Sequence, residues 1–379
     1  GDQAPVSGLE ARYRIAEKIA KPMNHLRLVD PATHTIIQDG MAVSAEVHIM
    51  QILTPEAEQA AEDTFLFKVK QTSMNDLIFM TAMNLEGRRL TFLPDSIGMM
   101  NALQTLNLSR NLLATLPESF GQLVVLHTLN LADNQLISLP ESFGQLAGLR
   151  DLNLYENQIG SLPENFGFIV VLETLDLGQN QIGALPDTFL QLISLITLSI
   201  VGNQLTALPS NFGRHQFLQK HMFLQTLDLQ RNQLATLPDT FGDLTALREL
   251  DLRANHVTAL PESFGYLTAL EKLELGLNQL TALPDNFGDL TSLQTLNLVQ
   301  NCLTSLPESF CELQSLQALD AYENRLTALP EDFGQLTALR TLNLWRNQLT
   351  GLPGSFSQLT GLETFICQDQ LPEVPVGGG

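Results

Sequence analysis

The amino-acid sequence predicts an α/β repeat solenoid, in which short similar units stack side by side around one continuous core. Three observations predict this fold class: asparagine, proline and phenylalanine each recur along most of the chain with the same period of 23 residues. One step in the asparagine series is longer, at 29 residues, because of an insertion. The recurring asparagines are Asn111, Asn134, Asn157, Asn180, Asn203, Asn232, Asn255, Asn278, Asn301, Asn324 and Asn347.

Each asparagine follows a Leu-x-Leu pair, which predicts a short strand. Leu250 and Leu252 precede Asn255, for example, and their spacing of two places both side chains on the same side of a strand, toward the core. The asparagine side chain both donates and accepts hydrogen bonds, so it can pair backbone groups that the turn after the strand leaves unpaired. We therefore expect a ladder of asparagines along the inside of the stack.

The remainder of each unit must return the chain to start a parallel neighbouring strand. Roughly 18 residues are available for this, which satisfies the length that a parallel crossover needs. The recurring proline suits an extended outer turn, because its fixed φ and missing N–H exclude it from a sheet interior. The recurring phenylalanines predict a stacked core spine, since no unit can bury its apolar side alone. They are Phe120, Phe143, Phe166, Phe189, Phe212, Phe241, Phe264, Phe287, Phe310, Phe333 and Phe356.

One unit reads Leu-Pro-x-x-Phe-Gly-x-Leu-x-x-Leu-x-x-Leu-x-Leu-x-x-Asn-x-Leu-x-x. Over about residues 77–370 this pattern resembles the leucine-rich repeat family in its 23-residue form. Similar repeats occur in intracellular Ras-pathway scaffolds, in plant intracellular Ras-group proteins and in bacterial secreted effectors. The resemblance implies a curved, right-handed horseshoe with a parallel sheet on its concave face, and with loops and short helical turns on its convex face. It also implies that the concave strands bind proteins.

The chain divides into three predicted parts. Residues 1–76 lack the repeat and are expected to form a leader and a partly helical cap, with a helix start at Thr54-Pro55-Glu56. Residues 77–370 are expected to form the solenoid, with about 12–13 repeats. Residues 371–379 are a short tail, which either suffices as a cap or is followed by more of the natural chain.

The terminal units depart from the pattern. In the first unit Arg88 replaces asparagine and Ile97 replaces phenylalanine, and near the other end Gln370 stands at the asparagine position. Terminal repeats have only one neighbour, so we expect them to be degenerate.

An insertion at about residues 214–221 accounts for the longer step. It lies between the phenylalanine and the next strand, so we expect it to bulge from the outer side. Arg214, His215, Lys220 and His221 make it the most basic place in the chain. A metal site or a docking site is one interpretation, and a tolerated surface insertion is the other. The second is favoured, because the two histidines have no cysteine or carboxylate in reach. The sequence predicts no metal and no cofactor.

Composition limits the classes of partner. The 379 residues include 41 acidic and 20 basic ones, for a formal net charge of −21. Nucleic acids and anionic membranes both attract basic surfaces, so neither is an expected partner. There is no apolar run of about 18 residues that could span a membrane. Three cysteines without a Cys-x-x-Cys pair favour a reducing compartment. We expect a cytoplasmic protein, or one secreted into a host cell as a bacterial effector.

The residues that flank the strand leucines are predicted to face the concave side. They stand six, four, two and one positions before each asparagine, and the column four positions before it is wholly polar. Like charges on adjacent strands repel, so a run of acids in this column needs nearby counter-charges. The acids are Asp228, Asp251 and Glu274, and the basic residues are Arg231, Arg253 and Lys272. We expect a structural rather than catalytic network, with Asp228, Asp251 and Arg253 on the partner-binding surface.

The column two positions before asparagine carries the aromatic residues that suggest a binding site. Large aromatic residues on an open face favour contact with a partner, and binding hot spots are rich in Trp, Tyr and Arg. Two patches are predicted. The first comprises Tyr322, Glu323, Trp345 and Arg346, and the second comprises Tyr155 and Glu156. The alternative is that Tyr322 packs on Trp345 across the strands and meets no partner.

A third candidate surface is apolar. One repeat exchanges its usual glycine, threonine and glutamine for Leu190, Ile193 and Ile196, which we expect on the outer flank. An exposed apolar patch marks a partner site or a self-association site.

No nucleophile elbow, phosphate loop, zinc spacing or kinase signature occurs in the sequence. The leading hypothesis is therefore a non-enzymatic protein-interaction module, a scaffold or an effector, which binds a protein or peptide with a basic patch on its acidic concave face. Two alternatives remain: the recognition domain of a larger enzyme, such as a ligase or a kinase-associated protein, and a self-associating structural repeat.

Overall fold

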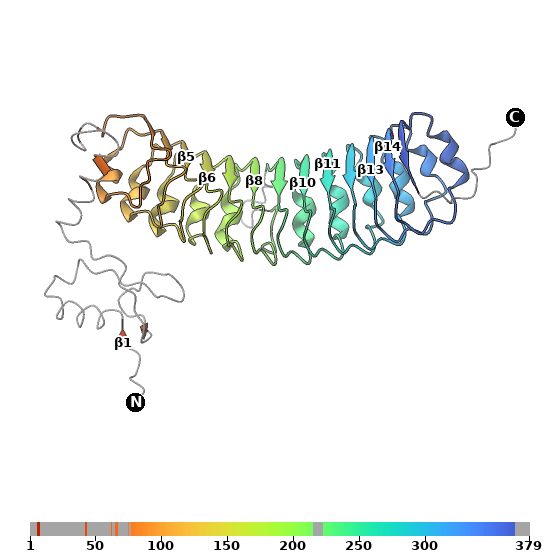
Figure 1. Ribbon diagram of the computed structural model, residues 1–379, viewed down its shortest axis with the longest axis horizontal. Coiled ribbons are helices and arrows are strands. Elements are labelled where there is room, and N and C mark those ends of the chain that lie inside the picture. The colour runs from red at the N-terminus through yellow and green to blue at the C-terminus, as the bar shows by residue number, and fades with distance from the viewer. Residues whose placement is uncertain are drawn as a thin grey trace.

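The computed structural model describes residues 77–214 and 223–367 continuously, together with Val6–Ser7, Ala42–Val43 and residues 62, 65, 66 and 75. The repeats form one long, gently curved stack, with the strands along one side (Figure 1). The predicted helix start at Thr54 lies outside the described residues, as do the insertion from residue 215 onward, Gln370 and the predicted tail.

Within the described residues the repeat strands form one parallel sheet of thirteen strands in sequential order, as the repeat period predicts. Each strand has three residues, and its middle residue pairs with that of its neighbour, as Leu250 does with Leu273. A separate antiparallel pair joins β1 (Val6–Ser7) and β2 (Ala42–Val43). The thirteen strands are β3 (Ala82–Asn84), β4 (Thr105–Asn107), β5 (Thr128–Asn130), β6 (Asp151–Asn153), β7 (Thr174–Asp176), β8 (Thr197–Ser199), β9 (Thr226–Asp228), β10 (Glu249–Asp251), β11 (Lys272–Glu274), β12 (Thr295–Asn297), β13 (Ala318–Asp320), β14 (Thr341–Asn343) and β15 (Thr364–Ile366).

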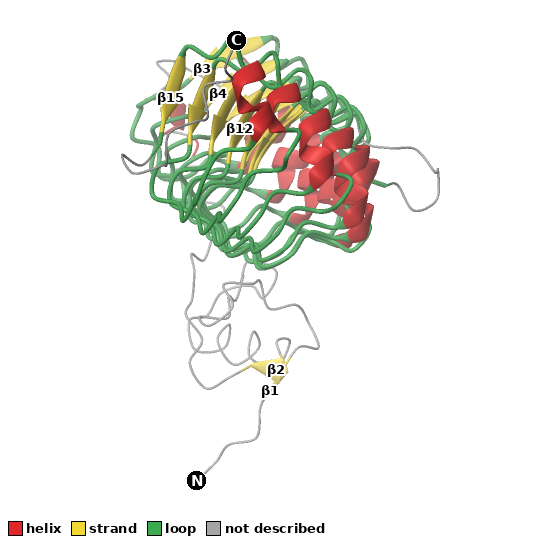
Figure 2. Ribbon diagram, turned by 90° about the vertical axis from the view of Figure 1, so that its right-hand side faces the viewer, coloured by secondary structure: helices red, strands yellow, loops and turns green. Residues whose placement is uncertain are grey.

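Short 3-10 helices occupy the opposite, convex side of the stack, which confirms the expected helical turns (Figure 2). Most begin directly after the recurring proline, whose φ of −65° to −71° sets the start of the turn. The helices are η3 (Asp95–Met99), η4 (Glu118–Gln122), η5 (Glu141–Gln145), η6 (Phe166–Phe168), η7 (Asp187–Gln191), η8 (Asp239–Asp243), η9 (Glu262–Tyr266), η10 (Phe287–Asp289), η11 (Glu308–Glu312), η12 (Phe333–Gln335) and η13 (Gly354–Gln358).

The unit that leads into the insertion has a different outer turn. Residues 210–213 form a turn in place of a helix, and Gly213 has a φ of +101°, a conformation that side chains with a Cβ rarely adopt. This irregular turn therefore directly precedes the insertion in the sequence.

The phenylalanine spine is present as predicted. The rings stack from Phe120 to Phe189 and again from Phe212 to Phe356, with neighbouring centroids 6.0–6.4 Å apart and ring planes within 17° of parallel. At the N-terminal end, Phe65 and Leu66 from the region before the repeats are buried in the same core. That region therefore contributes apolar side chains to the first unit.

The asparagine ladder is also confirmed, and it connects successive units. Asn255 donates through Nδ2 to the carbonyl oxygens of Leu252 in its own unit and Leu229 in the preceding unit, at 3.0 Å each. Its Oδ1 accepts the N–H of Leu234 at 3.0 Å. The recurring asparagines are all buried, at 3–8% exposure. Each therefore satisfies backbone groups that no strand partner reaches.

A second polar ladder runs along the convex side, and we did not predict it from the sequence. In several units the side chain two positions after the proline donates a hydrogen bond to a backbone carbonyl of the preceding unit. Ser142 Oγ donates to Glu118 O at 2.6 Å, and Asn286 Nδ2 donates to Glu262 O at 2.9 Å. The units are so close here that a Cβ on Gly121 would collide with the carbonyl oxygen of Ser142. The recurring Phe-Gly pair therefore reflects steric exclusion between units.

The prediction that Leu190 is exposed is wrong. Leu190 occupies this tight glycine column, and its side chain is only 8% exposed because neighbouring units enclose it. Ile193 is half-buried, whereas Ile196 is 37% exposed. The three residues do not form one continuous exposed apolar patch.

Candidate functional site

The polar column four positions before each asparagine shapes the concave face. In most units its Asn or Asp side chain accepts the backbone N–H two residues later, as Asn153 does from Tyr155 at 2.9 Å and Asn343 does from Trp345 at 3.2 Å. These bonds close a turn at the end of each strand. We did not predict this role from the sequence, although the wholly polar character of the column was the signal for it.

The residue just before each asparagine adopts a left-handed backbone conformation. Glu156 and Glu323 both have a φ of 57°, and Arg346 has a φ of 55°. Such values are uncommon for residues other than glycine, and here they recur in almost every unit. The conformation turns the chain out of the sheet plane, so the two residues before asparagine project at the rim of the concave face.

Four of the predicted site residues form one compact group, which we call the aromatic cluster: Tyr322, Glu323, Trp345 and Arg346. The rings of Tyr322 and Trp345 stack with centroids 5.5 Å apart. The Arg346 guanidinium lies 4.8 Å from the Trp345 ring centroid and 5.6 Å from that of Tyr322, and it pairs with Glu323 at 3.5 Å. Trp345 nevertheless remains 42% exposed. The alternative of cross-strand packing is thus correct as geometry, and it leaves a large ring surface open.

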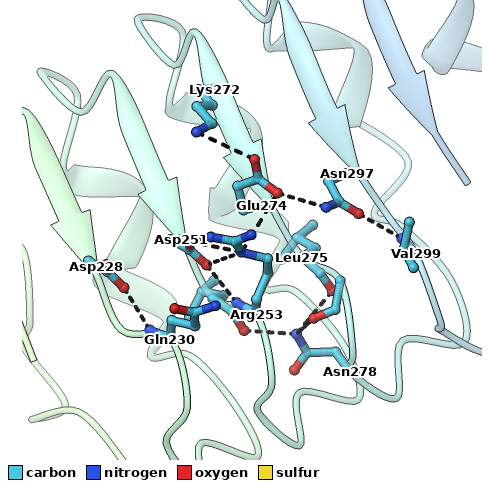
Figure 3. A network of polar contacts seen from close by, with 12 residues as sticks. Asp228, Gln230, Asp251, Arg253, Lys272, Glu274, Leu275, Asn278, Asn297 and Val299 are labelled. Carbon is cyan, nitrogen blue, oxygen red and sulfur yellow. Dashed lines mark hydrogen bonds and ion pairs between the residues drawn. The ribbon is translucent and has the colours of Figure 1, made fainter. Parts of the chain in front are cut away.

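The ion pairs expected in the acidic column are present on β10 and β11, as Figure 3 shows. Arg253 Nη2 lies 2.5 Å from Asp251 Oδ2, and Arg253 Nε lies 3.8 Å from Glu274 Oε2. Lys272 approaches the other Glu274 oxygen at 3.5 Å, and Asn297 donates to Glu274 at 2.8 Å. Glu274 is only 9% exposed, so its charge is compensated by two cations and an amide. These contacts connect β10, β11 and β12 across the middle of the concave face.

Arg231 does not join this network within the described residues. It stands one position before Asn232, where the backbone φ of 54° turns the side chain away from the strand column. Arg253 stands two positions before its asparagine and reaches both acids. A difference of one position in the unit therefore decides which arginine neutralises the acidic column.

Asp228 lies beside the network without a salt bridge among the described residues. Burial raises the pKa of Asp228 above its ordinary value, and the carboxylates of Asp251 and Asp176 add to this effect. The N–H of Gln230 and the Arg253 guanidinium oppose it without cancelling it. A raised pKa in the folded state means that the folded protein disfavours the charged form. The charged form of Asp228 therefore lowers the free energy of unfolding by its full amount at pH values above the folded-state pKa. This destabilising contribution becomes smaller as the pH falls toward the unfolded-state pKa.

We predict that Asp228→Asn stabilises the protein at pH 7. Asparagine occupies this column in other units and keeps the oxygen that accepts the N–H of Gln230. Removing one of several neighbouring like charges should raise the free energy of unfolding by about 0.5 kcal/mol. Denaturant unfolding at pH 7 and pH 4 checks this, because the gain should shrink at the lower pH. An equal gain at both values would contradict the electrostatic explanation.

The second predicted patch is smaller than the aromatic cluster. Tyr155 is half-buried, because it leans over Gly178 on the next unit: a Cβ on Gly178 would lie 2.9 Å from Tyr155 Cδ2 and 2.8 Å from Val201 Cγ1. Glu156 is exposed. Tyr155 follows β6 and Tyr322 follows β13, so the two patches are well separated along the sheet, as predicted.

Comparisons with known proteins agree with this architecture. A family profile described as leucine rich repeat matches residues 80–136, 215–257, 257–303 and 268–326, and a second leucine-rich repeat profile matches residues 338–359. No protein with a curated description matches the chain significantly. No helix in the described part of the chain is long and apolar enough to cross a membrane.

Solved structures provide similar folds. A leucine-rich repeat protein of Leptospira interrogans is 33% identical, with a TM-score of 0.59, over 84% of this chain and 82% of that one. The plant peptide hormone receptor RGFR1 in complex with RGF2 is 30% identical, with a TM-score of 0.66, over 77% of this chain and 48% of the receptor chain. The matched chain of the Drosophila Toll–Spatzle complex is 29% identical, with a TM-score of 0.65. The match covers 79% of this chain and 42% of that one. The chain thus spans about half the length of these two receptor chains.

Proposed function

Since this chain belongs to the leucine-rich repeat family, we propose that it is a non-enzymatic interaction module that binds a protein or peptide on its concave face. The aromatic cluster carries the proposal. Its rings are fixed in place by stacking and by the Glu323–Arg346 ion pair, yet Trp345 keeps 42% of its surface exposed. A rigid, exposed aromatic group loses little conformational entropy on binding, which is the property of a hot spot.

The charge of the concave face favours a partner with basic residues. Asp176 on β7, Asp228 on β9 and Asp251 on β10 lie along the middle of the sheet, and of these three only Asp251 forms a salt bridge among the described residues. A basic partner would reduce the mutual repulsion of these carboxylates. Such complementarity speeds association more than it increases affinity.

We also propose that the protein acts inside a cell, as a scaffold or as a bacterial effector. Cys302 and Cys311 are free thiols, which is consistent with a reducing compartment. Similarity to a bacterial leucine-rich repeat protein supports the effector role, and protein or peptide complexes of the receptor relatives support the class of partner.

We predict that Trp345→Ala weakens the binding of a captured partner by about 30-fold, or about 2 kcal/mol, because it removes a hot-spot ring and the surface on which Arg346 lies. Tyr322→Ala should weaken binding less, since Tyr322 is half-buried beneath the tryptophan. Calorimetric titration of the purified variants measures both. Tyr266→Ala is the matched control, because Tyr266 is 60% exposed in a convex helix. Unchanged affinity in the Trp345 and Tyr322 variants would refute this site.

A further inference from the structure

A hollow at the N-terminal end of the concave face has a charge opposite to that of the protein. It has a volume of about 540 Å³ and is lined by Asn84, Glu86, Gly87, Arg88 and Arg110. These residues follow β3 and β4, whereas the aromatic cluster follows β13 and β14. The hollow therefore lies at the other end of the proposed binding face.

Arg88 occupies an asparagine position of the repeat, and its location at the edge of the sheet explains why asparagine is not needed there. In interior units this place belongs to the buried asparagine, whose side chain bonds to the preceding unit, as Asn111 Nδ2 does to Leu85 O at 2.9 Å. β3 is the edge strand of the described sheet, so within the described residues the first unit has no preceding strand in the sheet for an asparagine to reach. An exposed arginine stands there instead. Gly87 beside it has a φ of +65°, and a Cβ on Gly87 would meet no atom within 4 Å, so the space above the backbone is open.

The hollow has one more cation than anion. Glu86 is the single carboxylate in its lining, and both its oxygens have partners: Arg110 Nη1 at 3.0 Å and Asn107 Nδ2 at 3.5 Å. The Arg110 side chain is still 70% exposed, so most of its donors remain accessible. Arg88 has no carboxylate partner among the described residues. Two guanidinium groups and one carboxylate give the lining a formal charge of +1 in a protein of charge −21.

We propose that this hollow, which we call the arginine hollow, binds the carboxylate of an aspartate or glutamate side chain on the protein partner. Guanidinium groups match the planar carboxylate with paired hydrogen bonds. A monoanion balances the charge of the lining, whereas a phosphate dianion would meet the retained Glu86 carboxylate. The N–H of Gly87 is already donated to Ser109 O at 3.0 Å, so it is not free to contribute to a backbone cradle for phosphate.

This inference rests on the proposed function, and it predicts how the partner is oriented along the sheet. Its acidic residue would lie at β3 and β4, its basic residues over the acidic middle of the sheet, and its hot-spot contact at β13 and β14. Ten strand spacings separate β4 from β14, or about 48 Å along the sheet at ~4.8 Å per strand. A partner that reaches both ends is therefore a folded domain or an extended segment of about 14 residues or more.

The test follows the arginine side chains directly, without the partner. Nitrogen-15 NMR of the Nε–Hε groups, assigned with Arg88→Lys and Arg110→Lys, is recorded on the full chain during titration with N-acetylglutamate α-amide. We expect saturable shifts at Arg88 and Arg110, and their loss in the Arg88→Gln/Arg110→Gln variant. Arg325 is the internal control, because it is exposed and has no carboxylate partner among the described residues.

The other arms of the titration distinguish the sources of the anion. Sodium chloride at equal ionic strength should produce no saturable shift. Two further titrations use N-acetylglycine, which represents the C-terminal carboxylate of a partner, and inorganic phosphate, which represents a phosphorylated side chain. Tighter binding of either one than of the glutamate derivative would overturn the assignment, as would equal shifts at Arg325 or none at Arg88. These results leave the aromatic cluster untouched, so failure of the arginine hollow is separable from failure of the proposed function.

Discussion

Replacing Asn255 with alanine should lower the free energy of unfolding by about 3 to 4 kcal/mol. The buried amide serves two units at once: it donates to Leu252 O and Leu229 O, and it accepts from the N–H of Leu234. Alanine cannot form these bonds, and the buried N–H of Leu234 is left without a partner, which costs about 1 to 3 kcal/mol. Leu252 O and Leu229 O each keep one bond, from Asn278 and Asn232, so each of the two lost carbonyl bonds adds only about 0.5 to 1.5 kcal/mol.

The effect is measured as the shift of the guanidinium chloride midpoint followed by circular dichroism. Gln233→Ala is the matched control, because this amide side chain is exposed one residue after Asn232 and should change stability by less than about 0.5 kcal/mol. A loss below about 1 kcal/mol for Asn255→Ala would show that the ladder contributes little. Because neighbouring units stabilise each other, the loss should also broaden the transition.

Phe264→Ala should destabilise the protein by about 3 to 5 kcal/mol. Its ring is fully buried and stacks between Phe241 at 6.1 Å and Phe287 at 6.4 Å, so truncation leaves a cavity in the middle of the spine. Neighbouring rings cannot close that cavity without shifting their own units. Tyr266→Ala, two residues away on the exposed convex side, should change stability by less than about 0.5 kcal/mol.

The loss of stability on replacing a spine phenylalanine should also depend on its position in the stack. Phe356 in the last described repeat is only half-buried and has a single neighbour in the spine, so Phe356→Ala should cost less than Phe264→Ala. Denaturant midpoints of both variants, measured side by side, check this order. Equal losses at the two positions would contradict a core that is stabilised by neighbours on both sides.

The features that could be predicted from the sequence are those that every unit must repeat. The asparagine ladder, the phenylalanine spine and the parallel strands each depend on one residue type at one position, so the period alone reveals them. The left-handed residue before asparagine escaped notice, because Glu156, Leu277 and Arg346 share that conformation and nothing in their chemistry. The backbone turn imposes it, and the side chain merely tolerates it.

Other features depend on distances between units that a sequence does not contain. Leu190 is apolar at a column where most units have glycine, and only the close packing of the convex side decides that it is buried. The choice of Arg253 over Arg231 as the counter-charge likewise depends on the direction of the turn. The arginine hollow was missed because Arg88 was read as degeneracy of a terminal repeat. Because the described sheet begins at β3, that position is also open to a charged side chain.

In the aromatic cluster the cross-strand packing is confirmed, whereas the binding of a partner stays a prediction. Tyr322 and Trp345 stack on one another, as a purely structural pair would, and the stack still presents an exposed ring with a cation and a carboxylate beside it. Intramolecular stacking therefore does not compete with binding here. It fixes the surface that a partner would meet.

The proposed binding surface can be tested by capturing partners from a cell lysate with three forms of this chain. The captured proteins are identified by mass spectrometry. The forms are the parent chain, the Tyr322→Ala/Trp345→Ala variant on the concave face and the Tyr266→Ala variant on the convex face. We expect a protein that is captured in equal amounts by the parent chain and the Tyr266→Ala variant. The Tyr322→Ala/Trp345→Ala variant should no longer capture this protein. Equal capture by all three forms, or loss with the Tyr266 variant alone, would contradict this expectation and move the binding surface away from the aromatic cluster.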